Sequence, residues 1–136
     1  MGDSPVWAAT PKNGIALINT ANANRDGSGT LGTVYTAGSN GGVIDAIFLQ
    51  SAGAVGVAIT AGMLRLFIET GGVARLCKEV PVTAGTPSAS VAGWSALLTP
   101  GNGLPPEGLR LAAGNILKAS TQIAENFNVV AQAGDF

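Results

Sequence analysis

The side chains that carry most enzyme chemistry are scarce in this sequence. It contains no histidine and a single cysteine, Cys77. Without histidine the chain has neither a Ser-His-Asp nor a Cys-His nucleophile system, and it lacks the commonest ligand of zinc sites. One cysteine cannot supply the ligands of a zinc or iron–sulfur site. Because Cys77 stands within an alternating apolar run, we interpret it as a buried structural thiol rather than a nucleophile.

Paired carboxylates are the catalytic option that remains, since a glycosidase needs only two. The candidates are Asp45, Glu69, Glu79, Glu107 and Glu125. A sugar site also needs an aromatic platform, and the chain offers only Trp7, Tyr35 and Trp94 as indole or phenol rings. A small carboxylate-dependent hydrolase is therefore an alternative, but we predict that the chain is not an enzyme.

Glycine-rich segments raise the possibility of a phosphate or calcium site. Neither 27–29 (GSG) nor 38–42 (GSNGG) is followed by a lysine and a helix start, which a phosphate-binding loop requires. The segment 24–29 (NRDGSG) is similar to the start of a calcium loop, but no bidentate glutamate follows at the right spacing. We interpret these segments as turns and predict neither a metal nor a cofactor.

The composition points to a protein that hides part of its surface. Only 11% of the 136 residues are charged, against about 25% in typical domains. The seven Lys and Arg residues are scattered, so the clustered positive charge needed to bind nucleic acid is missing. No run of 18 apolar residues predicts a membrane helix, and the first residues do not resemble a signal peptide. The single cysteine fits assembly in a reducing cytoplasm.

Short alternating runs between turn residues predict an all-β fold. The hairpin around Gly71-Gly72 is the clearest element, with strands over 57–70 and 73–82 and a cross-strand charge set of Arg65, Glu69, Arg75 and Glu79. The best helical candidate is the weak pattern over 120–127. The other strands are expected at 15–19, 33–37, 43–50, 90–99, 109–112, 116–121 and 125–133, with a hairpin joining 109–112 to 116–121. Eight or nine short antiparallel strands predict one β-sandwich or jelly roll.

The chain divides into an extended N-terminal arm, 1–12, and one sandwich domain, 13–136. We predict Trp94 to be a core residue. The candidate partner-binding residues lie at the two ends: Pro5, Val6, Trp7 and Pro11 in the arm, and Asp135 and Phe136 at the C-terminus. Trp7 is either a partner anchor or packs on its own domain, and Asp135-Phe136 is either an end-cap of the sandwich or a contact.

Three segments carry a resemblance to small virion proteins of tailed bacteriophages. They are 63–90 (MLRLFIETGGVARLCKEVPVTAGTPSAS), 104–114 (LPPEGLRLAAG) and 127–136 (FNVVAQAGDF). Within that group the chain resembles capsid decoration or cement proteins. The resemblance implies a jelly-roll-like fold, self-association as a homodimer or homotrimer, and a position on the capsid exterior. It also implies binding to the major capsid protein, which bridges its subunits and stabilises the expanded head.

Two further functions stay open from the sequence. One is a tail, baseplate or head-fibre component of the same kind of virion, although a fibre would be expected to show repeats or a coiled coil. The other is a carbohydrate-binding β-sandwich that contacts the host surface, which would need several exposed aromatics on one face.

Overall fold

The computed structural model describes residues 9–136, and this part of the chain contains ten strands and no helix. Six strands form one sheet, here called sheet A: β1 (Thr10–Ile18), β3 (Gly42–Ser51), β6 (Ser95–Pro100), β7 (Gly103–Leu104), β8 (Leu109–Leu111) and β10 (Phe127–Asp135). Four form sheet B: β2 (Gly32–Thr36), β4 (Gly62–Thr70), β5 (Val73–Val82) and β9 (Ile116–Thr121). Within the described residues, no segment has the length and apolarity of a membrane-spanning helix.

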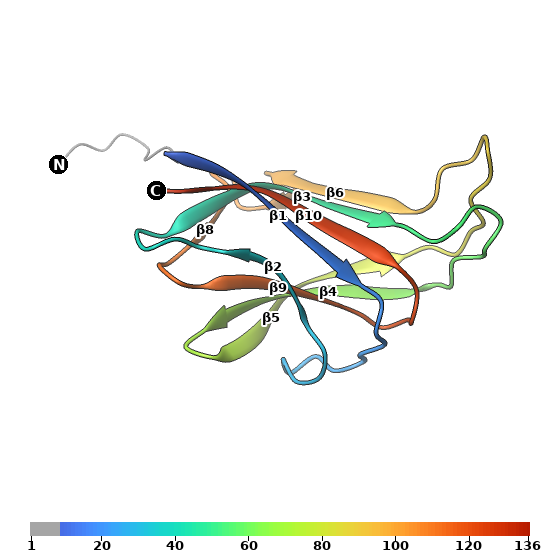
Figure 1. Cartoon of the computed structure of the whole chain (residues 1–136), viewed down its shortest axis with the longest axis horizontal. Helices are drawn as coiled ribbons and strands as arrows, with labels where there is room; N and C mark the ends of the chain where they lie inside the picture. The colour runs from blue at the N-terminus through green and yellow to red at the C-terminus, as the bar shows by residue number, and fades with distance from the viewer. Residues whose placement is uncertain (1–8) are drawn as a thin grey trace.

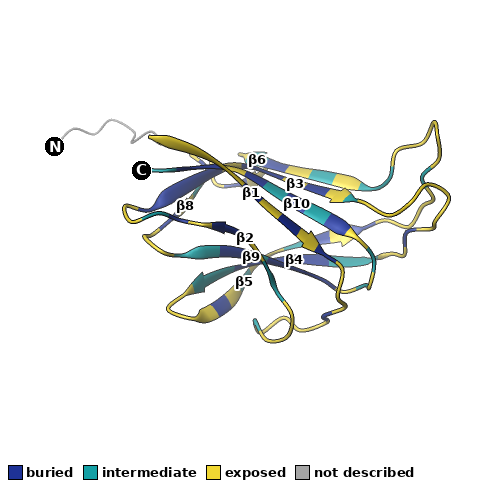
Figure 2. Cartoon of the chain, in the orientation of Figure 1, coloured by how far each residue is buried: buried dark blue, intermediate teal, exposed yellow. Residues whose placement is uncertain are grey.

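The two sheets lie one above the other and share a hydrophobic core (Figure 1). Each strand places alternate side chains on opposite sides, so a strand with one inward side contributes every second residue. Strand β10 contributes Phe127, Val129 and Ala131 to the core, and all three are fully buried. Sheet B contributes Leu64 and Leu117. Figure 2 shows these buried segments along the facing sides of the two layers.

The order of the strands interleaves the two ends of the chain. Sheet A runs β1-β10-β3-β6-β7, with β8 also paired to β3, and sheet B runs β2-β9-β4-β5. All pairs are antiparallel except β6 with β7. The last strand therefore lies between the first and the third, and residues more than 100 positions apart pair along β1 and β10.

The predicted all-β fold and the hairpin at Gly71-Gly72 are confirmed. Strands β4 and β5 pair across these two glycines, whose φ angles of 59° and 83° lie in the region that two-residue hairpin turns require. Arg65 pairs with Glu79 as expected, at 2.8 Å between Nε and Oε2. The rest of the predicted charge set is wrong, because Arg75 lies opposite Ile68 and Glu69 opposite Ala74, and Glu69 bonds to Lys118 of β9 instead.

A bulge breaks the simple alternation of side chains that the strand pattern over 43–50 predicts. The register of β3 against β10 skips Asp45, so Gln132 faces Ala46 and Ala133 faces Ile44. One extra residue inverts the alternation beyond it. Ile44, Ile47 and Leu49 consequently enter the core, while Phe48 points outward.

Other local predictions fail where tertiary pairing prevails. The hairpin expected between 109–112 and 116–121 is wrong, because β8 pairs with β3 in sheet A and β9 with β2 and β4 in sheet B. The helical pattern over 120–127 is instead the end of β9, a turn and the start of β10. Strands β4 and β6 begin at Gly62 and Ser95, later than predicted. Strand β1 begins at Thr10, so the last residues assigned to the arm belong to sheet A.

Gly14 lets the first strand of sheet A lie directly against sheet B. A Cβ atom at this position would stand 2.1 Å from the carbonyl oxygen of Val34 in β2 and 2.9 Å from Cβ of Tyr35. Backbone atoms cannot yield as a flexible side chain does, so any larger residue must push β1 and β2 apart. The absence of a side chain at Gly14 thus allows β1 of sheet A and β2 of sheet B to lie in contact.

We therefore expect Gly14→Ala to lower the free energy of unfolding by about 2 kcal/mol or more, the range of overpacked cores. Gly53→Ala is the matched control, because a Cβ there meets nothing within 4 Å. Its effect should stay within about 0.5 kcal/mol. Urea denaturation of the three proteins measures both values, and equal stabilities would contradict the close approach of β1 and β2.

Candidate interaction face

The outer side of sheet A carries a row of apolar side chains that crosses four strands. Backbone register places Ile15 of β1 opposite Val130 of β10, Val130 opposite Phe48 of β3, and Phe48 opposite Leu97 of β6. All four point away from the core because their strand neighbours fill it. Ile15 is 67% exposed, Leu97 48% and Phe48 39%. Such a contiguous exposed row on a small protein indicates a surface that is covered in function.

A second row runs parallel to the first and is mostly polar but uncharged. It consists of Leu17, Asn128, Gln50 and Ser95, which are paired in register across the same four strands. Leu17 adds another exposed apolar side chain at 56%. We call these two rows, Ile15–Val130–Phe48–Leu97 and Leu17–Asn128–Gln50–Ser95, the A face. None of its eight residues carries a charge.

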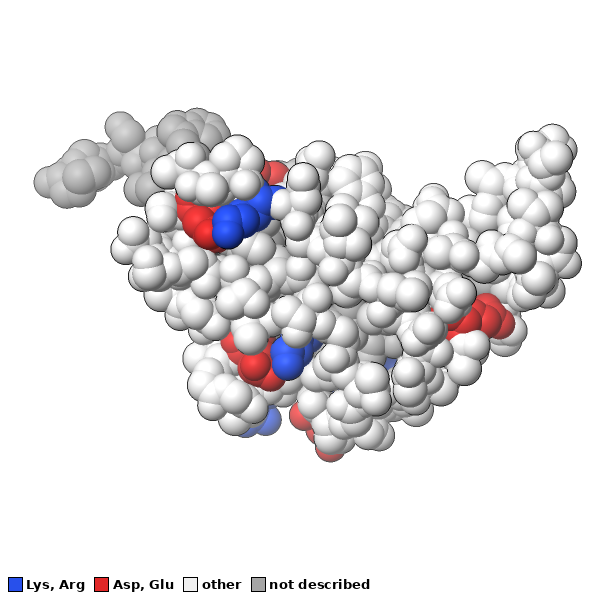
Figure 3. All heavy atoms as spheres, viewed as in Figure 1, with Lys and Arg blue, Asp and Glu red and all other residues white. Residues whose placement is uncertain are grey.

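The charged residues gather elsewhere. Lys12 and Asp135 form a salt bridge of 3.3 Å at the end of the β1/β10 pair. In the view of Figure 3, acidic and basic atoms form a few small groups separated by wide uncharged surface. The low charge content of the sequence is thus distributed unevenly.

The outer side of sheet B has the opposite character, because a loop and ion pairs cover it. The Arg25 guanidinium in the loop between β1 and β2 binds Glu79 of β5 at 3.0 Å, and Arg65 binds the same carboxylate. These hydrogen bonds, first that of Arg65 and then that of Arg25, lower the pKa of Glu79. Gly27 of the loop lies against Ala74, and Phe67, which points to this side, is fully buried. Sheet B therefore offers no bare apolar face comparable to that of sheet A.

In the loop whose sequence is similar to the start of a calcium loop, the polar groups form hydrogen bonds with one another. One Asp26 carboxylate oxygen accepts hydrogen bonds from the backbone N–H and the hydroxyl of Ser28. Asn22 donates to the carbonyl oxygens of Ser28 and Thr30, at 3.0 and 2.9 Å. In residues 9–136, no group of three or more acidic, histidine or cysteine side chains is placed to hold a metal ion. The loop is built as a cover for sheet B.

The C-terminal candidates lie at a junction between the two sheets. The Asp135 carboxylate accepts a hydrogen bond of 2.5 Å from the Tyr35 hydroxyl of β2 and a longer one from the Gly38 N–H. The bond from Tyr35 is the main reason why the pKa of Asp135 is lowered. Burial, and then this bond, raise the pKa of Tyr35. Asp135 thus caps the end of the two layers.

The remaining candidates are dispersed. The Phe136 ring is half exposed and lies 5.4 Å from the Arg110 guanidinium carbon, a cation–π contact. Pro11 is exposed in β1, opposite Gly134. Pro5, Val6 and Trp7 lie outside the described residues, so the structure brings none of them to a site. The A face was not predicted from the sequence, although its signal was present in the uncharged alternate residues Ile15 and Leu17 of β1 and Asn128 and Val130 of β10.

Three of the five acids considered for catalysis are engaged in structural contacts, while Asp45 of β3 and Glu107 of the loop before β8 are exposed. Glu69 binds Lys118 at 2.9 Å, and Glu125 accepts hydrogen bonds from the backbone N–H and hydroxyl of Thr60. Cys77 was predicted to be buried, but it is the extra residue of the β5 bulge and is exposed. Desolvation by its surroundings still raises the pKa of its thiol, the opposite of what activates a nucleophile.

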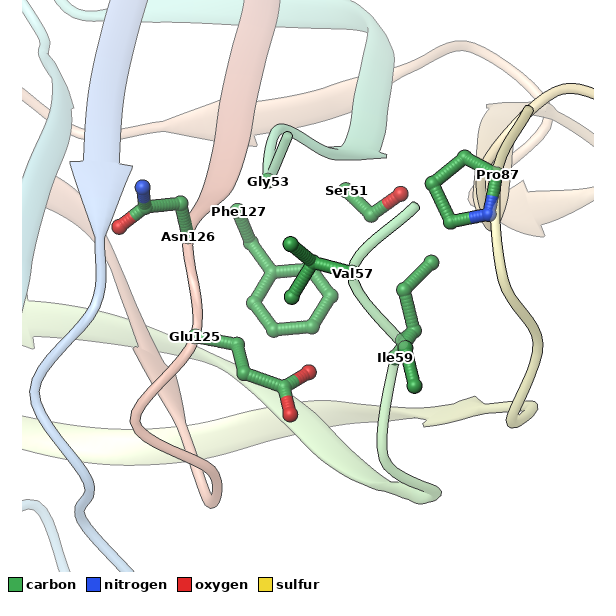
Figure 4. A pocket seen from close by; sticks show the side chains of 9 residues that line it. Ser51, Gly53, Val57, Ile59, Pro87, Glu125, Asn126 and Phe127 are labelled. Atoms are coloured by element: carbon green, nitrogen blue, oxygen red, sulfur yellow. The ribbon is translucent and has the colours of Figure 1, made fainter. Parts of the chain in front are cut away.

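Trp94 lines a cavity of about 190 Å³ together with Ile59 and Val91, and the smaller pocket of Figure 4 is a different one. The Trp94 ring is half-buried and packs edge-on against Phe127, with centroids 6.0 Å apart. The pocket of Figure 4 is bounded by Phe127, Val57, Ile59 and Pro87, with the Glu125 carboxylate at its rim. Its volume of about 30 Å³ has room for little more than a water molecule.

Comparisons with protein-family models, with curated proteins and with solved structures give no match. The assignment of function therefore rests on the geometry of the chain itself and on the sequence resemblance.

We expect the Tyr35–Asp135 bond to make stability depend on pH. A carboxyl with a lowered pKa in the folded state stabilises the fold above its unfolded pKa, near 3.8, and this stabilisation is lost as the pH falls through the folded value. Tyr35→Phe removes the main cause of that shift. At pH 7 it should lower the Tm by roughly 3–6 °C.

Thermal unfolding followed by circular dichroism from pH 7 to pH 2 measures this dependence. The difference in Tm between the wild-type chain and Tyr35→Phe should shrink below about pH 4, as the carboxyl is protonated in both proteins. A difference that stays constant across the whole range would show that the hydroxyl acts through packing alone.

Proposed function

We propose that this chain is a non-enzymatic structural protein of a tailed-bacteriophage virion, a capsid decoration or cement protein on the exterior of the head. In this role it binds and bridges subunits of the major capsid protein and stabilises the expanded shell. The observation that carries the proposal is the A face, a contiguous uncharged surface with exposed Ile15, Leu17, Phe48 and Leu97. Such a surface suits contacts between proteins and has no use in solution.

The strand order supports a jelly-roll β-sandwich, the fold that the resemblance implies. When the short strands β7 and β8 are set aside, β1-β10-β3-β6 faces β2-β9-β4-β5. Two four-stranded antiparallel layers in this interleaved order correspond to two Greek keys wound around each other, as in viral capsid and lectin jelly rolls. A cement protein needs a rigid scaffold of this kind and no reactive groups.

The physical demands of a shell fit the properties of the A face. A head offers many symmetry-related sites, so modest affinity at each contact suffices once several contacts act together. Apolar side chains fixed on a sheet lose little conformational freedom on binding, which reduces the entropic cost of association. An uncharged face also binds without a requirement for matched charges on the other side.

The alternatives fit the described residues less well. A carbohydrate-binding module would need free aromatic rings, but Trp94 packs on Phe127 and Tyr35 is buried between the sheets. Of the five candidate acids of a hydrolase, Glu69, Glu79 and Glu125 are held by hydrogen bonds or ion pairs, and only Asp45 and Glu107 are left, both exposed at the surface. A tail or baseplate component would use the same face, and the resemblance to decoration proteins favours the head.

Co-sedimentation with phage heads that lack the chain tests the proposal. We expect the wild-type protein to bind expanded heads in stoichiometric amounts and to leave unexpanded procapsids unbound. Leu97→Lys should weaken binding at least tenfold, because it places a charge on the A face. Val73→Lys is the matched control, since Val73 is equally exposed, at 49%, but lies on sheet B.

Loss of binding by Leu97→Lys alone would support both the role and the face. Equal binding by both variants would remove the A face from the contact. Failure of the wild-type chain to bind either shell would refute the decoration role.

The N-terminal arm is the second contact that we propose, with Pro5, Val6 and Trp7 as its anchors. Deleting residues 1–8 leaves β1 intact, because its pairing with β10 begins at Thr10 opposite Asp135. The deletion should therefore keep the Tm within about 2 °C of the wild-type value and weaken head binding at least tenfold. Trp7→Ala should reproduce most of the loss, and full binding by both variants would show that the arm is dispensable.

A further inference from the structure

We propose that the occupant of the A face is a second copy of this chain, so that neighbouring copies pair through the outer sides of their A sheets. The inference rests on the proposed function and names the partner of its central surface. Three properties of the face support it. A two-fold rotation lays each row on the same row of a second copy, the face carries no charge, and its size fits a weak contact.

The A face is complementary to itself. A two-fold axis that runs parallel to the strands, between β10 and β3, keeps each row on the same row of the other copy. It places Ile15 opposite the partner's Leu97 and Val130 opposite the partner's Phe48. In the second row it places Asn128 opposite the partner's Gln50, so amides meet amides. In the first row apolar groups are thereby buried against apolar groups, with the large Phe48 against the small Val130, and at the ends of the second row Leu17 meets the partner's Ser95.

The absence of charge on the eight residues of the A face removes the usual obstacle to self-pairing. A patch that carries net charge repels its own copy, and a buried ion without a partner costs several kcal/mol. The ion pairs Arg25–Glu79–Arg65 and Lys118–Glu69 lie on the other layer, and Lys12–Asp135 lies at the end of the strands. Two copies can therefore meet over the A face without burying a charge, and the exposed charges of the same sheet, Asp45 of β3 and Arg110 of β8, lie outside that face.

The size of the face predicts a weak dimer. Four strands about 4.8 Å apart, each contributing a span of three residues, present a flat area of roughly 19 by 10 Å. This is well below the ~800 Å² per partner of standard stable interfaces, and it falls in the range of transient contacts. A contact of this size has little effect in dilute solution but acts strongly between copies that a shell already holds side by side.

Sheet edges offer a poorer route to self-association. The exposed edge strand β5 carries Arg75, Lys78 and Pro81, and its bulge at Cys77 interrupts the regular ladder. Charged side chains, proline and bulges are the features that prevent strands from pairing edge to edge. At the β5 edge the structure thus favours pairing by faces over extension of the sheet.

Sedimentation velocity of the free chain, without heads, tests the pairing. Between about 1 µM and 1 mM, the wild-type sedimentation coefficient should rise from that of a monomer toward that of a dimer. Leu97→Lys acts twice in a symmetric dimer, so it should raise the dissociation constant about 100-fold if each site costs tenfold. Val73→Lys should leave the dissociation constant within threefold of the wild-type value.

Disulfide trapping tests the geometry. In a Cys77→Ser background, Ile15→Cys with Leu97→Cys should give a covalent dimer under copper-catalysed air oxidation. These two positions are three strand spacings apart in one chain, about 14 Å, so they cannot join within it. Leu97→Cys alone should stay monomeric, because the axis keeps the two copies of this residue at opposite ends of the row.

The outcomes separate this inference from the proposed function. A wild-type chain that stays monomeric to 1 mM, or a dimer that Leu97→Lys does not weaken, would overturn the pairing. If that same chain still binds expanded heads, the decoration role stands and the A face contacts the shell itself. Pairing in solution without any binding to heads would support the interface and refute the virion role.

Discussion

The structure depends on the insertion of the last strand between the first and the third. Strand β10 pairs with β1 over nine positions and with β3 on its other side, so sheet A is complete only when both ends of the chain are in place. Its inward residues Phe127, Val129 and Ala131 supply the centre of the core. Its outward Val130 joins Ile15 to Phe48 and makes one continuous row from separate strands. The core and the A face are therefore two sides of the same strand pairing.

The outer sides of the two sheets differ in how far they are covered. Sheet B is closed on its outer side by the Arg25–Glu79–Arg65 ion pairs and by the loop whose Gly27 lies against Ala74. Sheet A leaves Ile15, Leu17 and Leu97 about half exposed or more. The chain can cover an outer face with a loop, and does so on one side only. This asymmetry argues that the bare face has a partner, because an exposed apolar row favours aggregation unless something covers it.

Much of the fold could be predicted from periodicity and turn residues. The hairpin at Gly71-Gly72 followed from two glycines between alternating runs, and β2 and β3 followed from similar local patterns. The faces of β3 could not be predicted, because the bulge at Asp45 arises from pairing with a strand more than 80 residues away. The partner of β8 was equally inaccessible, since local spacing favoured a hairpin with β9 while the core placed these strands in different sheets.

The candidate site was harder to predict than the fold. The low charge content predicted a surface to be hidden, but it did not say where. The predicted partner-binding residues lay at the chain ends, but Asp135 binds Tyr35 and caps the two sheets. The A face joins residues from β1, β3, β6 and β10, and its members become neighbours only through the interleaved strand order. A row of this kind is invisible until the register is known.

Footprinting of the head-bound chain would test the central claim, that the outer side of sheet A is the surface covered in function. Carbene labelling followed by mass spectrometry compares the accessibility of Ile15, Leu17, Phe48 and Leu97 in the free and the bound protein. Val55, Val73 and Val91, exposed apolar residues elsewhere on the chain, serve as internal references. Our account predicts strong protection of the four face residues and unchanged labelling of the three valines. Protection of the valines with an unchanged A face would contradict it.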